Sequence, residues 1–166
     1  MDAGRISFLA VALGICLAAA TLANAADPSP GQTLTQSGSL PTFPGPKDYF
    51  TGTVHVQQLF TGDPALAATG GRVTFEPGAR SAWHSHPAGQ YLIILDGVGW
   101  VQQWGGPVLE VHAGDVVWCP PGVKHWHGAS STKSMTQISI TGVRGDTNVQ
   151  WLEKVSDEQY QKNPPR

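Results

Sequence analysis

The sequence has little charge, almost no cysteine and no long amphipathic segment. Charged residues make up 13% of the 166 residues, and the formal net charge is −2. So low a charge excludes a chain kept disordered by charge repulsion and gives no electrostatic basis for binding nucleic acid. Two cysteines exclude a disulfide-rich scaffold. The sequence also lacks a Cys-x-x-Cys pair, a dinucleotide-binding Gly-x-Gly-x-x-Gly and a Walker A loop, which removes several common enzyme classes.

The first residues have the pattern of a secretory signal peptide. Arg5 precedes an apolar run over 6–22, and Ala23-Asn24-Ala25 forms an Ala-x-Ala cleavage site. We expect a signal peptide over 1–25 and a periplasmic or secreted protein that does not associate with the membrane after cleavage. The alternative is an uncleaved membrane anchor, for which the run is short. Only Cys119 would remain after cleavage, and its apolar neighbours predict a buried, inert thiol.

The remaining chain predicts an all-β domain behind a loose N-terminal segment. Segment 26–48 is rich in Pro, Gly and Ser, and we expect an extended arm there, a folded domain over 49–160 and a short tail over 161–166. A single helical turn is predicted near the C-terminus, where Ser156 and Gln159 have the spacing of a capping box. Short strands separated by turn residues favour a sandwich or barrel. The predicted strands are 53–60, 66–75, 82–86, 91–95, 99–104, 108–112, 115–118, 124–128 and 135–141.

The histidines are spaced as metal ligands would be. His84 and His86 are two residues apart on a predicted strand, so their side chains point to the same face. Gln90 follows where the next strand begins, and His125 follows a Pro-Pro-Gly turn. Several imidazoles at one cavity suit Mn, Fe, Co, Ni, Cu or Zn. The alternative is that each histidine has a separate structural role.

Two motifs resemble those of the cupin family. They are Gly78-x5-His84-x-His86-x3-Gln90-x6-Gly97 and Gly114-x5-Pro120-x-Gly122-x2-His125. The resemblance covers roughly 50–141 and implies a double-stranded β-helix, that is, a jelly-roll barrel, often as a homodimer or higher homo-oligomer. It also implies a divalent metal inside the barrel, held by His84, His86, Gln90 and His125. The family usually carries Glu in place of Gln90, so this ligand set is neutral, and a bound ion would keep its full charge as a Lewis acid. A decayed site is the alternative.

The segments 72–80, 82–87, 99–102, 114–118, 124–129 and 157–160 resemble more closely the small bacterial manganese cupins that act as hydroxynitrile lyases. This resemblance implies manganese as the metal, with Fe, Zn, Cu or Ni as alternatives, and His127 as the catalytic residue that moves a proton. It also implies a pocket for a small-molecule substrate formed by Ser81, Val73, Gln137 and Thr141. The last two stand where those lyases carry His and Gln, so the substrate or the reaction can differ.

Three functions therefore compete. The first is a lyase that cleaves a mandelonitrile-like cyanohydrin to an aldehyde and cyanide. The second is an oxygenase with three His on Fe or Cu, and the third is a cupin that binds a small molecule without turnover. We rank the lyase first on the closer motif match, because fold alone does not choose among them.

Overall fold

The structure, a computed structural model, describes residues 31–62 and 65–161. The expected signal peptide over 1–25, the first residues of the expected arm and most of the expected tail lie outside this range. The chain divides into two units after Leu34, and the architecture below is that of the second unit, which begins at Thr35. Within the described ranges, no helix has the length and apolar character needed to cross a bilayer.

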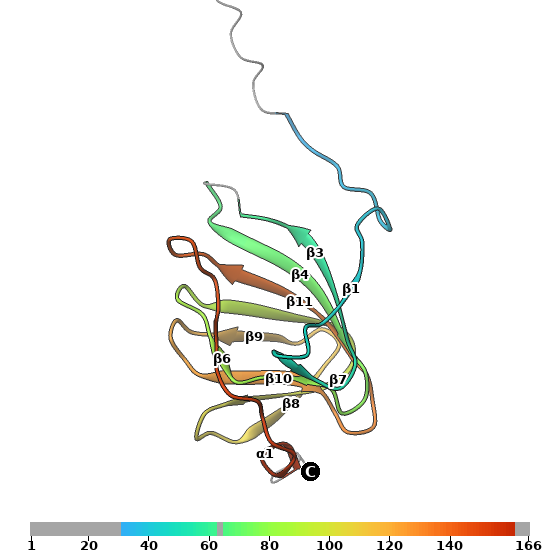
Figure 1. Cartoon of the computed structure of the whole chain (residues 1–166). Helices are drawn as coiled ribbons and strands as arrows, with labels where there is room; N and C mark the ends of the chain where they lie inside the picture. Colours follow the sequence, from blue (N-terminus) through green and yellow to red (C-terminus); the bar gives the residue numbers. More distant parts are fainter. Residues whose placement is uncertain (1–30, 63–64, 162–166) are drawn as a thin grey trace, which may run out of the picture. The chain divides into compact units, whose positions relative to one another are not determined.

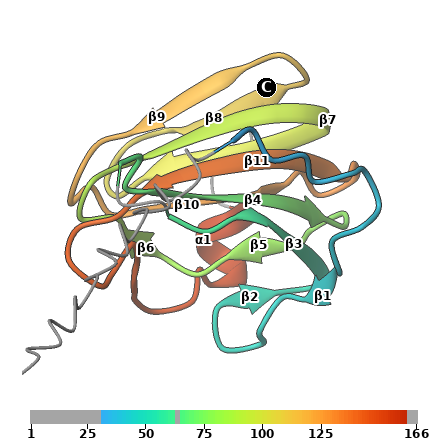
Figure 2. The ribbon, with the colours of Figure 1, turned by 90° about the horizontal axis from the view of Figure 1, so that it is seen from above.

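The prediction of an all-β jelly-roll barrel is confirmed. Neighbouring strands are antiparallel, and they form two sheets that curl around a common interior (Figures 1 and 2). The first sheet has the order β1-β3-β4-β11-β7-β9, and the second contains β8-β7-β10 with β5, β6, β2 and β12. The elements are β1 (Phe43–Pro44), β2 (Phe50–Thr51), β3 (Val54–Phe60), β4 (Ala68–Phe75), β5 (Arg80–Ser81), β6 (His84–Ser85), β7 (Gln90–Gln103), β8 (Val108–His112), β9 (Val116–Cys119), β10 (His125–Ala129), β11 (Met135–Gly142), β12 (Gln150–Trp151) and α1 (Asp157–Gln161).

The long strand β7 corrects one prediction. The sequence predicted two strands separated by a turn at Asp96-Gly97, but β7 is continuous over 14 residues. Its first half pairs with β11 and β9, and its second half pairs with β10 and β8. Gly97 has φ +82°, and a Cβ there would lie 1.9 Å from the carbonyl oxygen of Ser134. Only glycine fits this bend, which carries the strand from one sheet into the other.

The predicted strand 82–86 is wrong in its bounds. Only β6, His84–Ser85, is a strand within it, and His86 follows the strand, while β5 lies before the predicted range and is separated from β6 by Ala82 and Trp83. The backbone of Trp83 bonds to Glu153 and Leu152 instead of continuing the ladder. The segment after β12 therefore occupies the place of a regular strand neighbour.

The apolar core packs against the histidines. Phe75, Leu92, Ile94 and Met135 are at most 2% exposed and fill the interior beside the first sheet. The ring of Phe75 meets the ring of His127 edge-on at 5.7 Å. One side of His127 is therefore packed against the apolar core.

Helix α1 packs against the second sheet and confirms the predicted cap. The backbone N–H of Ser156 donates to Oε1 of Gln159 at 2.9 Å, and the N–H of Gln159 donates to Oγ of Ser156 at 3.1 Å. The Tyr160 hydroxyl donates to the carbonyl of Ala129 at 2.9 Å, which fixes the helix against the end of β10.

Candidate metal centre

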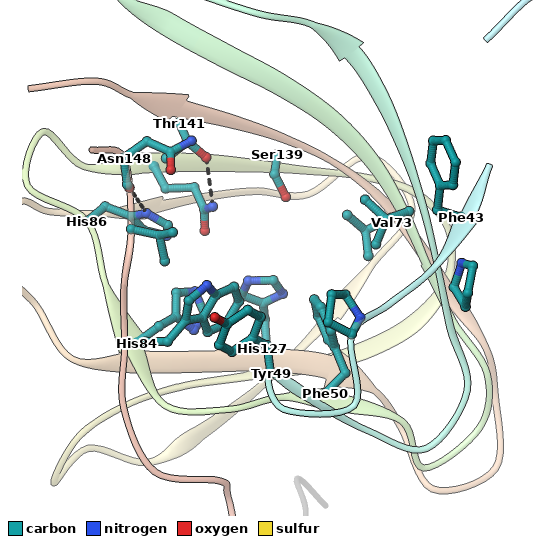
Figure 3. Close-up of a pocket in the computed structure, with 16 residues that line it drawn as sticks. Phe43, Tyr49, Phe50, Val73, His84, His86, His127, Ser139, Thr141 and Asn148 are labelled. Atoms are coloured by element: carbon teal, nitrogen blue, oxygen red, sulfur yellow. Dashed lines mark hydrogen bonds between the residues drawn. The ribbon is translucent and has the colours of Figure 1, made fainter. Parts of the chain in front are cut away.

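Strand pairing brings the histidines together. His84 on β6 lies directly opposite His125 on β10, and their ring centroids are 4.3 Å apart. His86 lies 5.0 Å from His84 by the same measure. His127, two residues beyond His125 on the same strand face, lies 5.2 Å from His84. All four imidazoles are at most 5% exposed and point into one interior, as Figure 3 shows for His84, His86 and His127.

Gln90 reaches the same interior from the opposite sheet. It begins β7 and lies opposite Thr141 on β11. Its Nε2 donates to Oγ1 of Thr141 at 2.9 Å, which fixes the orientation of the amide and leaves Oε1 free. Donor groups from both sheets thus converge across the barrel.

Three histidines are held in one tautomer by backbone carbonyls. The Nδ1 atoms of His84, His86 and His125 lie 2.9, 2.6 and 2.8 Å from carbonyl oxygens of Ala82, Asn148 and Val123, respectively. A carbonyl only accepts, so each Nδ1 carries the proton and each Nε2 keeps its lone pair. Metal-ligating histidines are oriented in the same way in other proteins.

The unpartnered atoms fit a cation. Nε2 of His86, Nε2 of His125 and Oε1 of Gln90 are buried without a hydrogen-bond partner among the described residues. Burial lowers the pKa of His84 and His86, and it lowers that of His125 to about 4, so all three are neutral at pH 7. Buried acceptors without donors are costly, and nitrogen and oxygen donors of this kind suit a borderline divalent metal.

His127 differs from the other three histidines. Nε2 of Gln137 lies 3.1 Å from its Nδ1, and an amide nitrogen only donates. Nδ1 of His127 is therefore the acceptor, and the proton of this imidazole is on Nε2. The same amide nitrogen donates to Oγ of Ser139 at 2.9 Å, while Oε1 of Gln137 is buried without a partner. The reverse amide orientation would leave two buried N–H groups unpaired instead of one carbonyl, which costs more.

This tautomer decides between two possible ligand sets. Nitrogens of His84, His125 and His127 lie within 4.8 Å of one another and could hold a metal by distance alone. A protonated Nε2 cannot be a ligand, however, and Nδ1 of His127 is occupied by Gln137. The hydrogen bonds therefore favour the ligand set that includes His86 and Gln90. His127 is then a hydrogen-bond donor beside this set, through its Nε2–H.

A cavity of about 380 Å³ opens onto these residues. One side of it is apolar and largely aromatic, and its polar side chains are neutral (Figure 3). None of its lining residues is Asp, Glu, Lys or Arg. Besides His84, His86, Gln90 and His127, the lining consists of Phe43, Pro44, Pro46, Tyr49, Phe50, Val56, Val73, Ser139, Thr141, Asn148, Val149 and Trp151.

The expected pocket residues occupy two different positions. Val73 and Thr141 line the cavity. Ser81 and Gln137 do not, because both lie behind His127. Oγ of Ser81 accepts from the backbone N–H of His127 at 3.2 Å, and Gln137 bonds to its ring. These two residues position His127 instead of facing a ligand.

Sequence reasoning missed the aromatic side of the cavity. Tyr49 and Trp151 stack with ring centroids 4.7 Å apart and planes 8° apart, and Phe50 meets Trp151 edge-on at 5.7 Å. Phe43 belongs to β1, inside the segment predicted to be an extended arm. In the sequence, the available sign of this aromatic group was the pair Tyr49-Phe50, which directly follows the Pro-rich segment 26–48. Nothing in the sequence linked it to Trp151, about a hundred residues away.

Cys119 is buried, as predicted, and burial raises the pKa of its thiol to about 12. A neutral thiol is a poor ligand and a poor nucleophile. Cys119 therefore adds no chemistry to the centre.

Comparisons with known proteins agree with this fold. Residues 71–141 match the cupin domain family. The chain is 55% identical over 126 residues to an (R)-mandelonitrile lyase from Granulicella tundricola, a match that covers 75% of this chain and 95% of that protein. It is also similar to the crystal structure of a cupin-like protein from Thermotoga maritima, with a TM-score of 0.70, 38% identity and coverage of 81% and 98% of the two chains. A cupin-2 domain protein from Rhodospirillum rubrum, with a TM-score of 0.60, 20% identity and coverage of 80% and 86%, shares the fold.

Proposed function

This chain belongs to the cupin family, and from that premise we propose that it is a metal-dependent lyase that cleaves an aromatic cyanohydrin to an aldehyde and cyanide. The observation that carries the proposal is an uncharged, partly aromatic cavity that opens onto neutral metal donors and a buried imidazole N–H. The relative named as a mandelonitrile lyase, 55% identical to this chain, supports the same class of substrate.

His84, His86, Gln90 and His125 would hold the metal. In three of the four, the atom that would bind the metal is buried and has no hydrogen-bond partner. In His84 the bond from Nδ1 to a backbone carbonyl leaves the lone pair of Nε2 free for the metal. A divalent metal, for which we propose manganese, supplies a Lewis acid that lowers the pKa of a substrate hydroxyl. Because the ligands are all neutral, they do not reduce the charge of the ion.

The cavity selects a neutral substrate with an aromatic group. Tyr49, Phe50 and Trp151 offer ring faces and edges on which an aryl group can pack. Across the cavity, Ser139 and Thr141 offer hydroxyl groups (Figure 3). No lining side chain would pair with a carboxylate or an ammonium group, so burying a charged substrate would carry an uncompensated desolvation cost.

His127 would stabilise the departing cyanide. In the overall reaction the carbon–carbon bond to the nitrile breaks, its electron pair leaves with cyanide, and the proton lost by the hydroxyl ends on that cyanide. His127 lines the cavity as a neutral imidazole, and its Nε2–H would donate a hydrogen bond to the departing cyanide while the proton stays on the nitrogen. Gln137 and Ser81 hold its ring and backbone, so they are positioning residues in this scheme.

The test is release of cyanide from mandelonitrile by protein loaded with manganese. His127→Ala should lower the rate about 10²- to 10³-fold, the usual cost of removing one hydrogen-bond donor to a developing anion, and leave the metal content unchanged. His112→Ala, at an exposed histidine on β8, is the matched control and should keep the full rate.

A loaded protein that releases no more cyanide than a metal-free sample would contradict the proposal. Oxygen uptake with iron or copper bound would then favour the oxygenase. Binding of an aromatic ligand without any product would favour a role in binding alone.

A further inference from the structure

The inward face of β11 carries three polar side chains in a row. Gln137, Ser139 and Thr141 are two residues apart on this strand, so all three point to the interior of the barrel. Gln137 bonds to His127 at one end of the row, and Thr141 bonds to Gln90 at the other. Ser139 lies between them, and its side chain lines the cavity (Figure 3). Ser139 therefore stands between a proposed metal ligand and the imidazole that would face the departing cyanide.

Gln137 uses both of its amide hydrogens within this group. Its Nε2 lies 3.1 Å from Nδ1 of His127 and 2.9 Å from Oγ of Ser139. An amide nitrogen carries two hydrogens and does not accept, so each neighbour receives one hydrogen. Oε1 of Gln137 is buried without a partner among the described residues. The amide thus keeps its two donor bonds although its carbonyl is left unpaired, which is unfavourable.

These bonds fix the role of the Ser139 hydroxyl. Its oxygen accepts from Gln137, so its own hydrogen is left to donate. Within residues 31–62 and 65–161, no protein atom accepts that hydrogen. The side chain lines the cavity, so the hydrogen is available to a molecule bound there. A hydroxyl that accepts from an amide is also a better donor, because consecutive hydrogen bonds polarise one another.

Ser139 and His127 present two uncharged donors to one cavity. Both are bonded to the same nitrogen of Gln137, so this one amide orients the Ser139 hydroxyl and sets the tautomer of the imidazole. The cavity is lined by neither Lys nor Arg, so negative charge that develops in it meets only neutral donors from the protein. Preorganised neutral donors of this kind stabilise charge that forms during a reaction.

We propose that Ser139 is a substrate-binding residue whose hydroxyl donates a hydrogen bond to the nitrile of the substrate and then to the cyanide that leaves. This assignment rests on the proposed function and names the group that recognises the nitrile. The substrate hydroxyl would go to the metal and the aryl group to the aromatic rings, which leaves the nitrile for β11. A nitrile nitrogen only accepts hydrogen bonds, and Ser139 has only a hydrogen to offer.

Thr141 is the other hydroxyl on this face, and its position suits a different contact. Its oxygen accepts from Nε2 of Gln90, so its hydrogen is also free to donate. Thr141 lies at the Gln90 end of the row, however, whereas Ser139 shares the amide of Gln137 with His127. The nitrile is therefore assigned to Ser139.

The test compares two ligands of the same shape, neither of which can react as a cyanohydrin. Benzonitrile and phenylacetylene both carry a linear group on a phenyl ring, but only benzonitrile ends in an acceptor. Isothermal titration calorimetry with manganese-loaded protein gives the Kd of each ligand. A net hydrogen bond corresponds to about a fivefold change in Kd, so wild-type protein should prefer benzonitrile by at least this factor. Ser139→Ala should reduce the preference about fivefold.

Thr136→Val and Thr141→Val are the matched controls on the same strand. The hydroxyl of Thr136 bonds to Thr74 outside the cavity, and that of Thr141 lies inside it. Both variants should keep the wild-type preference. A preference that survives Ser139→Ala would overturn the assignment, because another group, such as the metal, would then hold the nitrile. A preference that is lost in Thr141→Val and kept in Ser139→Ala would overturn it as well.

The proton of His127 is measured in the same variant. Long-range ¹⁵N–¹H NMR spectra of metal-free Ser139→Ala should show it still on Nε2, because the bond from Gln137 remains. Loss of the preference together with a move of this proton to Nδ1 would assign the effect to His127 and overturn the role of Ser139.

Failure of the proposed function gives a different result. Protein that discriminates between the two ligands through Ser139 but releases no cyanide from mandelonitrile would retain the nitrile site and contradict the lyase. Protein that releases cyanide without this discrimination would retain the lyase and contradict the role of Ser139.

Discussion

At the scale of single residues, the chemistry of the site depends on which nitrogen of each imidazole carries its proton. Backbone carbonyls place that proton on Nδ1 of His84, His86 and His125, whereas the side chain of Gln137 places it on Nε2 of His127. Four buried histidines in one interior thus take two roles without any difference in charge. The difference comes from the group that bonds to each Nδ1 atom, which is a carbonyl acceptor in three cases and an amide donor in the fourth.

Gln137→Leu tests this division of roles. Removing the amide donor should take away the preference of His127 for the Nε2–H tautomer, and a hydrogen bond worth about 1 kcal/mol corresponds to a roughly fivefold change in the tautomer ratio. Long-range ¹⁵N–¹H NMR spectra of metal-free protein measure this ratio directly. Thr141→Val, on the same strand as Gln137, removes the bond to Gln90 on β7 and should leave His127 unchanged. A wild-type spectrum with the proton of His127 on Nδ1 would contradict the assignment.

At the scale of elements, the barrel depends on one strand that belongs to both sheets. Gln90, at the start of β7, faces the cavity, and the second half of the strand pairs with β10, which carries His125 and His127. The bend at Gly97 therefore sets the distance between the donors on the two sides of the barrel. A change in this bend would move Gln90 relative to the histidines.

Gly97→Ala should destabilise the fold by more than the strain of a positive φ alone. That strain costs about 1 to 3 kcal/mol, and here the new methyl group would also meet the Ser134 carbonyl. Gly105→Ala is the control, since Gly105 has φ +78° but nothing lies within 4 Å of the position that its new methyl group would take. Urea unfolding of both variants measures the difference. Equal losses of unfolding free energy would show that the close approach at Gly97 is unimportant.

Several elements were predictable because their residues alternate or form known turns. The strands β3, β8, β10 and β11 begin and end within one residue of their predicted bounds, and the capping box of α1 was visible in two side chains. The strands β1, β2 and β12 were missed because two residues cannot show a period. The Asp96-Gly97 pair is typical of a hairpin turn, and the sequence does not show that the ladder continues through it.

At the scale of the whole molecule, the meeting of the candidate metal donors in one interior was easier to predict than the cavity. The donors lie within two compact motifs, so spacing along the chain was informative. The aromatic side combines Phe43, Tyr49 and Phe50 with Trp151, and only tertiary structure brings these segments together. The expected signal peptide lies outside the described residues, and its cleavage before Ala26 remains a prediction.

Metal binding should stabilise the whole domain. A ligand that binds only the folded state adds about 2.7 kcal/mol at a concentration one hundred times its Kd. Thermal unfolding of metal-free protein, repeated after addition of Mn²⁺, should therefore show a higher Tm, and a chelator should reverse the shift. The double variant His84→Ala, His86→Ala should show no shift. An equal rise in Tm for this variant would place the metal at other residues.

The three kinds of group that line the cavity have a consequence for stereochemistry. They are aromatic rings, the hydroxyl groups of Ser139 and Thr141, and the imidazoles with Gln90. Under the proposed function, the aryl group, the hydroxyl and the nitrile of a cyanohydrin each have a different preferred surface. A carbon held at three unlike points can be seated in only one handedness. The arrangement would therefore make the enzyme enantioselective, and in the reverse direction it would direct cyanide to a single face of a flat aldehyde.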